Sequence, residues 1–357
     1  MRRLLHAAAA LLLTLFVLIS CGDGAGVHPG EIVAEPKLQS DPAQLDAALL
    51  CAPFAHPDKP PVLLVHGTFT AGFEQSDWSY LPLLAARGYD VCTVSYPDRG
   101  LGDMQLSAEY VAHALRRIHD QSGRAVALIG HSQGVAVARW AVKWWPSARA
   151  AVDDFVMLAG PNHGTERAQN GGLLPLLSAV GLVPEVIYQF APRSQFMQAT
   201  NAGDETPGEI SYTVLYTELD ELVQPVRPVP TAAVDYGLDN PRVANILLQD
   251  VCPGRFVDHV TIGLSDRLAF ELVLDALSHD GPADVVRAGG AELCGLAALV
   301  PEQIVAPDAV QDVVSVLQQE PVNGLPEPHF ATEEPPLQDY AQTAEQARHQ
   351  GGGRSIE

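Results

Sequence analysis

Five residues, Gly130-His131-Ser132-Gln133-Gly134, constrain the fold of this chain more than any other feature. They match the pattern G-x-S-x-G, in which a serine lies on a sharp turn between a strand and a helix. An apolar run at Ala125–Ile129 predicts the strand before the turn, and Val135–Trp145 predicts an apolar helix after it. The two glycines leave room for the chain to fold back tightly. The pattern predicts that Ser132 is a nucleophile whose hydroxyl projects into a cleft.

Other segments alternate between strand and helix patterns. Buried strands are predicted at Pro61–Val65, Tyr89–Tyr96, Asp154–Ala159 and Ser211–Thr217, and a helix at Leu106–His119. Strands that alternate with helices indicate a mostly parallel sheet with helices on both faces. Combined with the serine turn, this order predicts the α/β-hydrolase fold.

The composition divides the chain into regions. We expect one catalytic domain over residues 45–319, with a cap-like insertion at about 168–200 between two strands. Residues 320–357 are rich in Pro, Glu, Gln and Gly and hold few large apolar side chains. Such a segment buries too little surface to offset its ordering entropy, so we expect this tail to be disordered.

The N-terminal residues have the pattern of an export signal. Arg2 and Arg3 precede the apolar run Leu4–Ile19, which is shorter than the roughly 20 residues of a membrane span. The run ends in Ser20-Cys21-Gly22, which resembles the cleavage site of a bacterial lipoprotein. We therefore expect a signal peptide at 1–20, lipidation of Cys21, a tether over 21–44 and a place on the membrane of a bacterial cell envelope. An ordinary secretory signal and a retained single-pass anchor are the alternatives.

The cysteine count agrees with export. The chain has 5 cysteines, and lipidation of Cys21 leaves Cys51, Cys92, Cys252 and Cys294. Four cysteines in an oxidising compartment permit two disulfides, and the sequence alone allows three pairings.

The charge and the motifs exclude several function classes. The net charge of −22 argues against binding of nucleic acid or of anionic lipid through basic patches. We find no P-loop, no dinucleotide fingerprint and no clustered His/Cys site, so we expect neither a cofactor nor a metal. We expect a monomer that acts on a small-molecule or lipid ester.

A serine nucleophile of this fold needs a base and an acid, in the chain order Ser, Asp or Glu, His. His259 lies in Phe256–Val260, after a Cys-Pro-Gly turn and before a helix, which suits the base. The other histidines after Ser132 suit it less, because they precede any acid, end a helix or fall in the tail: His163, His279, His329 and His349.

Asp220 is the leading candidate for the acid because it follows the strand Ser211–Thr217, where this architecture places a carboxylate. Glu218 and Glu221 are nearby alternatives. Asp258 is adjacent to His259 in sequence, so its carboxylate would hardly reach Nδ1 of that ring. The acid holds the imidazole tautomer and stabilises the imidazolium.

Two backbone N–H groups should stabilise the oxyanion. One belongs to Gln133, the residue after the nucleophile, and the other to the loop after an early strand. Thr68, in His66-Gly67-Thr68, is the best candidate for the second. His66 precedes the serine, and we interpret it as a structural histidine of this loop.

With these residues assembled, residues 40–300 resemble the lipase B branch of the α/β-hydrolase lipase family. The resemblance rests on Gly67-Thr68, Gly88–Cys92, Ser132–Gly134 with Trp144-Trp145-Pro146-Ser147, Asp220–Pro225 and Asp258-His259. It implies the triad Ser132, Asp220 and His259, the oxyanion residues Thr68 and Gln133, and the disulfides Cys51–Cys92 and Cys252–Cys294.

The sequence departs from that branch at several positions. His131 precedes the nucleophile, as in many bacterial lipases, and His66 stands where the branch has proline. No cysteine follows Cys294, so the C-terminal disulfide of the branch is absent. The insertion from Ala168 to Thr200 has diverged, which leaves acyl-chain preference and lid behaviour open.

The resemblance implies a triacylglycerol lipase or a carboxylesterase. An acyltransferase or a polyester hydrolase could use the same triad. A surface lipoprotein that only binds ligands is a further alternative, but a binding module has no need of a nucleophile, a base, an acid and oxyanion donors together.

Overall fold

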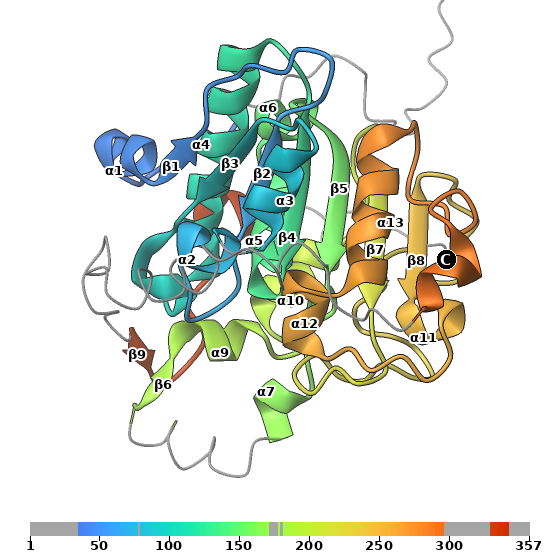
Figure 1. Ribbon diagram of the computed structural model, residues 1–357. Coiled ribbons are helices and arrows are strands. Elements are labelled where there is room, and N and C mark those ends of the chain that lie inside the picture. Colours follow the sequence, from blue (N-terminus) through green and yellow to red (C-terminus); the bar gives the residue numbers. More distant parts are fainter. Residues whose placement is uncertain (1–34, 78, 171–177, 179–180, 296–328, 343–357) are drawn as a thin grey trace, which may run out of the picture. The chain divides into compact units, whose positions relative to one another are not determined.

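A seven-stranded sheet lies at the centre of the fold in the computed structural model (Figure 1). The strands follow the order β1-β3-β2-β4-β5-β7-β8, and all neighbours are parallel except β1 and β3. The structure describes residues 35–77, 79–170, 178, 181–295 and 329–342. The strands of the main sheet are β1 (Leu49–Cys51), β2 (Val62–Val65), β3 (Val91–Val94), β4 (Val126–His131), β5 (Val152–Leu158), β7 (Ser211–Tyr216) and β8 (Val243–Leu247).

Helices cover both faces of the sheet. The longer ones are α4 (Met104–Ser122), α5 (Gln133–Trp144) and α13 (Arg267–Ser278). Short elements complete the fold: α1 (Pro42–Ala47), α2 (Gly72–Ser76), α3 (Tyr80–Ala86), η1 (Pro97–Gly100), α6 (Pro146–Ala150), α7 (Arg167–Asn170), α9 (Glu185–Gln189), α10 (Gln195–Asn201), α11 (Leu248–Val251), α12 (His259–Leu264), η2 (Gly290–Cys294), and the pair β6 (Val183–Pro184) and β9 (Phe330–Ala331).

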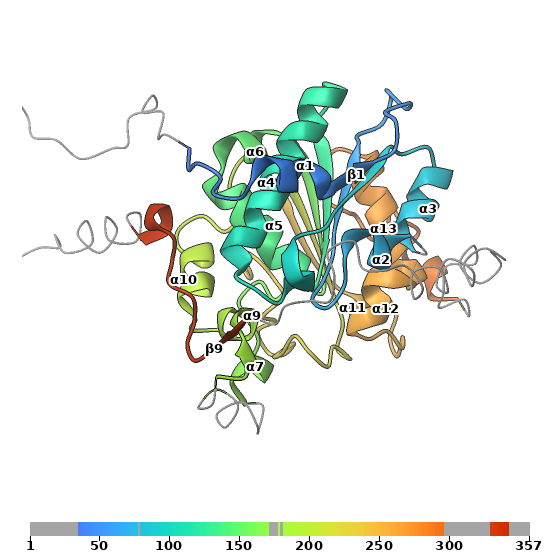
Figure 2. The ribbon, with the colours of Figure 1, turned by 90° about the vertical axis from the view of Figure 1, so that its left-hand side faces the viewer.

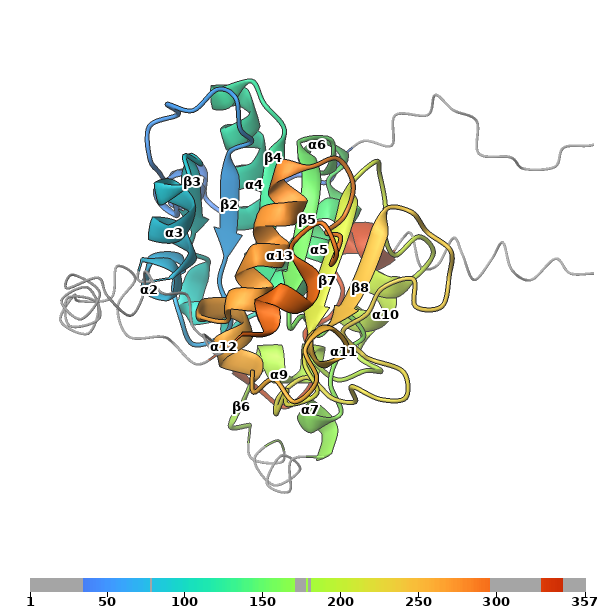
Figure 3. The same ribbon diagram turned by 45° about the vertical axis from the view of Figure 1, so that its right-hand side comes forward.

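The side chains of the sheet alternate between two hydrophobic clusters, one on each face. On β2, Leu63 and Val65 join the cluster formed with α4 and α5 (Figure 2), whereas Val62 and Leu64 join the cluster formed with α3, α12 and α13 (Figure 3). Strands buried on both faces are continuous apolar runs, which is why the sequence shows them so clearly.

The structure confirms the predicted fold class, and its main sheet has two strands beyond those that the sequence predicts. These are the edge strands β1 (Leu49–Cys51) and β8 (Val243–Leu247), of which β1 is antiparallel to its neighbour. Leu50 and Cys51 of β1 are exposed, and the first three residues of β8 are only half-buried, so neither strand is the fully buried apolar run of a central strand. Their pairing with β3 and β7 defines them.

Residues 35–44 lie on the domain, although the tether was expected to extend to 44. The carboxylate of the buried Glu109 accepts hydrogen bonds from the N–H groups of Gln39 and Ser40, at 2.8 Å and 2.7 Å. The indole of Trp145 donates to the Pro36 carbonyl at 2.9 Å. These contacts need a few well-placed backbone groups, which a polar composition does not reveal.

Residues 329–342 likewise pack on the domain, within the range expected to be disordered. β9 pairs with β6, and Leu337 and Ala341 are buried. The Tyr340 ring contacts Trp140, Trp144 and Trp145. The average composition of 320–357 hides this short apolar group; the rest of that range lies outside the described residues.

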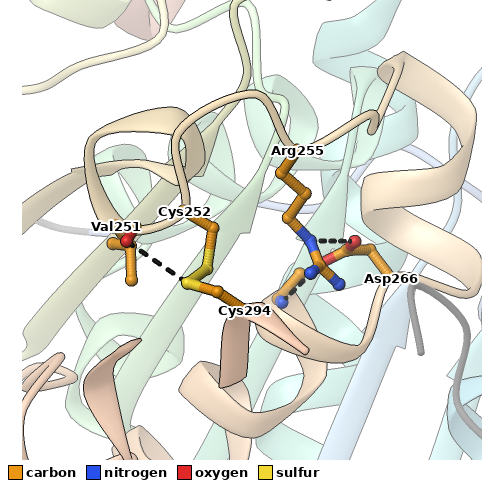
Figure 4. Close-up of a disulfide and its surroundings, with 6 residues drawn as sticks. Val251, Cys252, Arg255, Asp266 and Cys294 are labelled. Atoms are coloured by element: carbon orange, nitrogen blue, oxygen red, sulfur yellow. Dashed lines mark hydrogen bonds and ion pairs between the residues drawn. A yellow bond between two sulfur atoms is a disulfide. The ribbon is translucent and has the colours of Figure 1, made fainter. Parts of the chain in front are cut away.

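Two disulfides join distant parts of the chain, in the pairing that the resemblance implies. Cys51–Cys92 links the paired strands β1 and β3, and Cys252–Cys294 links the end of α11 to η2 (Figure 4). The signal at 1–20 and the lipidated Cys21 lie outside the described residues. Among the helices that the structure describes, none is long and apolar enough to span a bilayer.

Candidate active site

Ser132 lies between the end of β4 and the first residue of α5. Its backbone has φ 55° and ψ −126°, an uncommon conformation for a residue with a side chain. The Ser132 N–H donates to the Leu158 carbonyl of β5 at 2.9 Å, which fixes the turn to the sheet. The helix start and its positive dipole end therefore meet at the serine.

The two glycines of the motif are required by close packing. A Cβ on Gly130 would lie 2.9 Å from the Val135 nitrogen, and a Cβ on Gly134 would lie 2.3 Å from the Val65 carbonyl oxygen. Real Cβ atoms do not approach backbone so closely. The spacing of the motif thus follows from α5 packing directly against β2 and β4.

His259 joins Ser132 to Asp220. Its Nε2 lies 2.8 Å from Ser132 Oγ, and its Nδ1 lies 3.0 Å from each carboxylate oxygen of Asp220. The chain brings these residues together from the loop after β7 and the start of α12. The carboxylate fixes the tautomer: Nδ1–H donates to Asp220, so Nε2 is left to accept the hydroxyl proton of Ser132.

Asp220 is buried and is held in place by backbone groups. The residue is 3% exposed, and its carboxylate accepts from the N–H groups of Leu222 and Val223 at 2.9 Å and 2.7 Å. These donors hold the carboxylate in a fixed position beside the imidazole.

The alternative acids have other partners. Glu218 pairs with Arg227 at 2.7 Å, and Glu221 accepts from the backbone N–H of His259 at 3.1 Å, away from the imidazole. Asp258 caps α12 by accepting from Thr261 N–H at 2.7 Å. None of the three carboxylates is bonded to Nδ1 of His259.

The other candidate histidines that the structure describes are not hydrogen-bonded to Ser132. His163 contacts Glu205 at 3.0 Å, His279 contacts Asp275, and His329 contacts Asp98 at 2.6 Å. His66 stacks on Tyr96 and has its Nδ1 2.7 Å from the Gly67 carbonyl. Burial lowers the pKa of His66 to about 4, so this ring is neutral at ordinary pH. His349 lies outside the described residues.

Both expected oxyanion residues lie at this site. Gln133 is the first residue of α5, where N–H groups have no partner within the helix. Thr68 lines the same cavity as Ser132 and His259. No hydrogen bond joins the Thr68 N–H to another described residue.

An apolar cavity of about 470 Å³ opens over Ser132 and His259. Its volume suits an ester with a substantial apolar part. The apolar lining comes from loops, from α9 and from α12: Phe69, Ile187, Phe190, Leu222, Val223 and Val260. Ile187 and Phe190 belong to the expected cap-like insertion, which thus forms one wall of the cavity where it is described.

Two further residues at the site were not predicted to act there. These are His131 and Gln75. His131 Nε2 lies 2.8 Å from the His259 carbonyl oxygen, and the Gln75 amide nitrogen lies 3.2 Å from His131 Nδ1. Burial lowers the pKa of His131 to about 4. The sequence distinguishes His131 only as a departure from the family, and Gln75 in α2 belongs to no motif. The contact between their side chains joins residues 56 positions apart and appears only in the folded chain.

Within the described part of the chain, no group of three His, Cys, Asp or Glu side chains could hold a metal ion. The site combines a hydroxyl, an imidazole, a carboxylate and backbone N–H donors beside one apolar cavity. This arrangement can transfer an acyl group through the serine.

Comparisons with known proteins agree with this geometry. Residues 59–229 match the family "Lipase (class 2)". The chain is 32% identical to "Lipase B" of Pseudozyma antarctica over 311 residues, which cover 82% of this chain and 88% of that protein. It also resembles the crystal structure of Aspergillus fumigatus lipase B, with a TM-score of 0.73 and 29% identity over 89% of this chain and 76% of that chain. The chain belongs to this lipase family and is a carboxylic ester hydrolase of the α/β-hydrolase fold.

Proposed function

We propose that this protein is an exported, lipid-anchored serine hydrolase that cleaves carboxylic esters through an acyl-enzyme on Ser132. The observation that carries the proposal is the contact of 2.8 Å between Ser132 Oγ and His259 Nε2, with Asp220 on the opposite side of the ring. A nucleophile, a base and an orienting carboxylate in this order form a catalytic triad.

In the first half-reaction, His259 Nε2 accepts the proton of Ser132 while Oγ attacks the ester carbonyl carbon. The oxyanion that forms accepts hydrogen bonds from the N–H group of Thr68, which lines the cavity, and from that of Gln133, the residue after the nucleophile. The intermediate then collapses, the C–O bond to the alcohol breaks, and His259 returns its proton to the leaving oxygen. An acyl ester of Ser132 remains.

In the second half-reaction, a water molecule replaces the alcohol. His259 accepts a proton from the water, whose oxygen attacks the acyl carbon and forms a second oxyanion in the same place. Collapse releases the carboxylic acid and returns the proton to Ser132. The Asp220 carboxylate accepts from Nδ1–H and stabilises the imidazolium in both half-reactions.

The cavity supports a lipase or a carboxylesterase. Apolar side chains dominate its lining, which favours the desolvation of an acyl chain or an apolar alcohol. The net charge of −22 fits a neutral ester better than an anionic one.

Export and anchoring rest on the sequence. Arg2-Arg3, the apolar run Leu4–Ile19 and Ser20-Cys21-Gly22 support a lipoprotein signal, and the two disulfides fit an oxidising compartment. We propose that lipid on Cys21 holds the enzyme at a membrane of the cell envelope.

A panel of p-nitrophenyl esters and triglycerides, assayed with the wild type and with Ser132→Ala, tests the function. We expect hydrolysis by the wild type and a loss of roughly 10⁶-fold in kcat for the variant, as is typical when a triad loses its serine. Retention of ester hydrolysis by folded Ser132→Ala would exclude Ser132 as the nucleophile.

A further inference from the structure

We propose that Gln75 and His131 are positioning residues. Through one chain of hydrogen bonds they fix the position of the oxyanion loop relative to the catalytic base, His259. The oxyanion loop is His66–Thr70. The inference rests on the proposed function, because it assigns these residues a role only if Thr68 stabilises an oxyanion formed at Ser132.

The chain of hydrogen bonds has one consistent direction. The His259 carbonyl can only accept, so His131 Nε2 donates to it at 2.8 Å, and His131 Nδ1 is left as an acceptor. The Gln75 amide nitrogen donates to Nδ1 at 3.2 Å. Gln75 Oε1 then accepts from the Gly67 N–H at 2.7 Å. The reversed amide would place NH₂ against the Gly67 N–H, so the structure favours a single orientation of Gln75.

These contacts fix the peptide that carries the oxyanion donor. The Gly67 carbonyl and the Thr68 N–H belong to one planar peptide unit and point in opposite directions. His66 Nδ1 donates to the Gly67 carbonyl at 2.7 Å, and Gln75 Oε1 accepts from the Gly67 N–H. The Thr70 hydroxyl lies 3.1 Å from both the Gly67 carbonyl oxygen and Gln75 Oε1 and donates to one of the two. With both sides of Gly67 held, the direction of the Thr68 N–H is set before substrate binds.

The oxyanion loop is also close enough to Ser132 for small shifts to matter. A Cβ on Gly67 would lie 3.2 Å from the Cβ of Ser132 and 3.6 Å from His131 Nδ1. Oxyanion donors act over about 2.7–3.1 Å, so a displacement of a fraction of an ångström weakens them. Positioning by Gln75 therefore affects the transition state more than the binding of substrate.

His131 is confined from the other side by α12. A Cβ on Gly263 would lie 2.2 Å from His131 Cδ2, so the glycine allows the ring to pack against the helix that begins at His259. A protonated ring would turn Nδ1 into a donor facing the Gln75 NH₂ group. The low pKa of the buried His131, about 4, keeps the ring neutral and the chain of bonds intact.

The test is steady-state kinetics of Gln75→Leu, His131→Leu and the double variant on p-nitrophenyl esters. We expect kcat to fall about 10- to 100-fold in each single variant, less than for removal of an oxyanion donor, with KM within about twofold of the wild type. We expect the double variant to lose no more than the worse single variant, because both break one chain. The rate of inactivation by a p-nitrophenyl alkylphosphonate should fall in parallel with kcat.

Gln105→Leu is the matched control: like Gln75, Gln105 makes several side-chain hydrogen bonds, but it lies buried on α4 and is not among the residues that line the cavity. If Gln75→Leu folds poorly, Gln75→Asn serves instead, because its amide is one methylene too short to reach both Gly67 and His131. An unchanged kcat in either Gln75 variant, a kcat loss equal to that of Gln105→Leu, or fully additive losses in the double variant would overturn the proposal.

Ser132→Ala is assayed beside these variants to separate this inference from the proposed function. If Ser132→Ala is inactive and Gln75→Leu behaves as the control, the positioning role alone is wrong. If Ser132→Ala keeps the wild-type kcat, the proposed function fails and the positioning role with it.

Discussion

At the scale of single residues, the triad consists of buried side chains that fixed contacts hold in place. Asp220 and His259 are 3% and 2% exposed, and their contact replaces the water that both side chains have lost. Ser132, with its positive φ, points at this pair from a rigid turn. The triad geometry therefore depends on a few fixed groups, each of which can be altered separately.

Asp220→Asn should lower kcat by up to about 10⁴-fold while the protein stays folded. The amide of asparagine can donate to Nδ1, which would favour the tautomer with a proton on Nε2 and remove the base. Glu221→Gln is the control, because Glu221 contacts only the backbone N–H of His259. A mild effect of Asp220→Asn beside a severe effect of Glu221→Gln or Glu218→Gln, measured with one p-nitrophenyl ester, would reassign the acid.

His66→Phe should flatten the dependence of unfolding free energy on pH between about 4.5 and 6.5. The pKa of buried His66 is lowered from 6.5 to about 4, so in this window the unfolded chain binds more protons than the folded protein. Stability contributed by neutral His66 is therefore lost as the pH falls from 6.5 toward 4, by roughly 3 kcal/mol. Phenylalanine keeps the stack on Tyr96 and removes the titration.

The comparison of wild type with His66→Phe by urea unfolding isolates this contribution. Asp154 changes the unfolding free energy in the opposite direction. Burial raises its pKa to about 7, so the stability that it contributes is lost as the pH rises toward 7. Its contribution, and that of His131, cancels in the difference between the two proteins. Equal pH slopes for the two proteins would show that His66 titrates alike in the folded and unfolded states.

At the scale of elements, the segment 329–342 is part of the fold. It adds β9 to β6, and Glu334 accepts from the N–H groups of Gln195 and Phe196 at 2.8 Å, at the start of α10. β6 lies directly before α9, whose Ile187 lines the cavity. Through β6 and α9, the segment thus supports one wall of the active-site cavity.

Leu337→Ala should destabilise the protein by about 2–3 kcal/mol, because Leu337 is 4% exposed and its removal leaves a cavity. Val286→Ala is the control, since Val286 is 84% exposed. Urea unfolding measures both variants. A loss below about 0.5 kcal/mol for Leu337→Ala would mean that residues 329–342 do not pack as described.

The elements that the sequence revealed are those with a strong local signal. The central strands around Leu63 and Leu128 are buried on both faces, and Ser132 lies in a motif whose spacing reflects close packing. Edge strands, the packing of Leu337 and the contact of Gln75 with His131 depend on partners far along the chain. No local pattern encodes such partners, so these features required the folded structure.

At the scale of the whole molecule, the proposed anchor determines where the enzyme acts. The net charge of −22 provides no attraction to an anionic membrane, so lipid on Cys21 would have to supply the affinity. One acyl chain binds a bilayer only marginally, so stable anchoring implies more than one chain, as bacterial lipoproteins carry.

Cys21→Ser, expressed in a bacterium that processes lipoproteins, tests the anchor. We expect the loss of palmitate labelling and the release of esterase activity from the membrane fraction. Ser20→Ala serves as the control, since it keeps a small residue before Cys21 and leaves Cys21 in place. Unchanged membrane retention of Cys21→Ser would instead indicate that Leu4–Ile19 itself is the anchor.

The central claim, that Ser132 is the nucleophile of an ester hydrolase, is tested most directly by covalent labelling. The protein is treated with a fluorophosphonate, digested and analysed by mass spectrometry. We expect one modified serine, Ser132, with labelling that ester substrate slows and that Ser132→Ala abolishes. Modification of a different serine, or undiminished labelling of Ser132→Ala, would contradict the central claim.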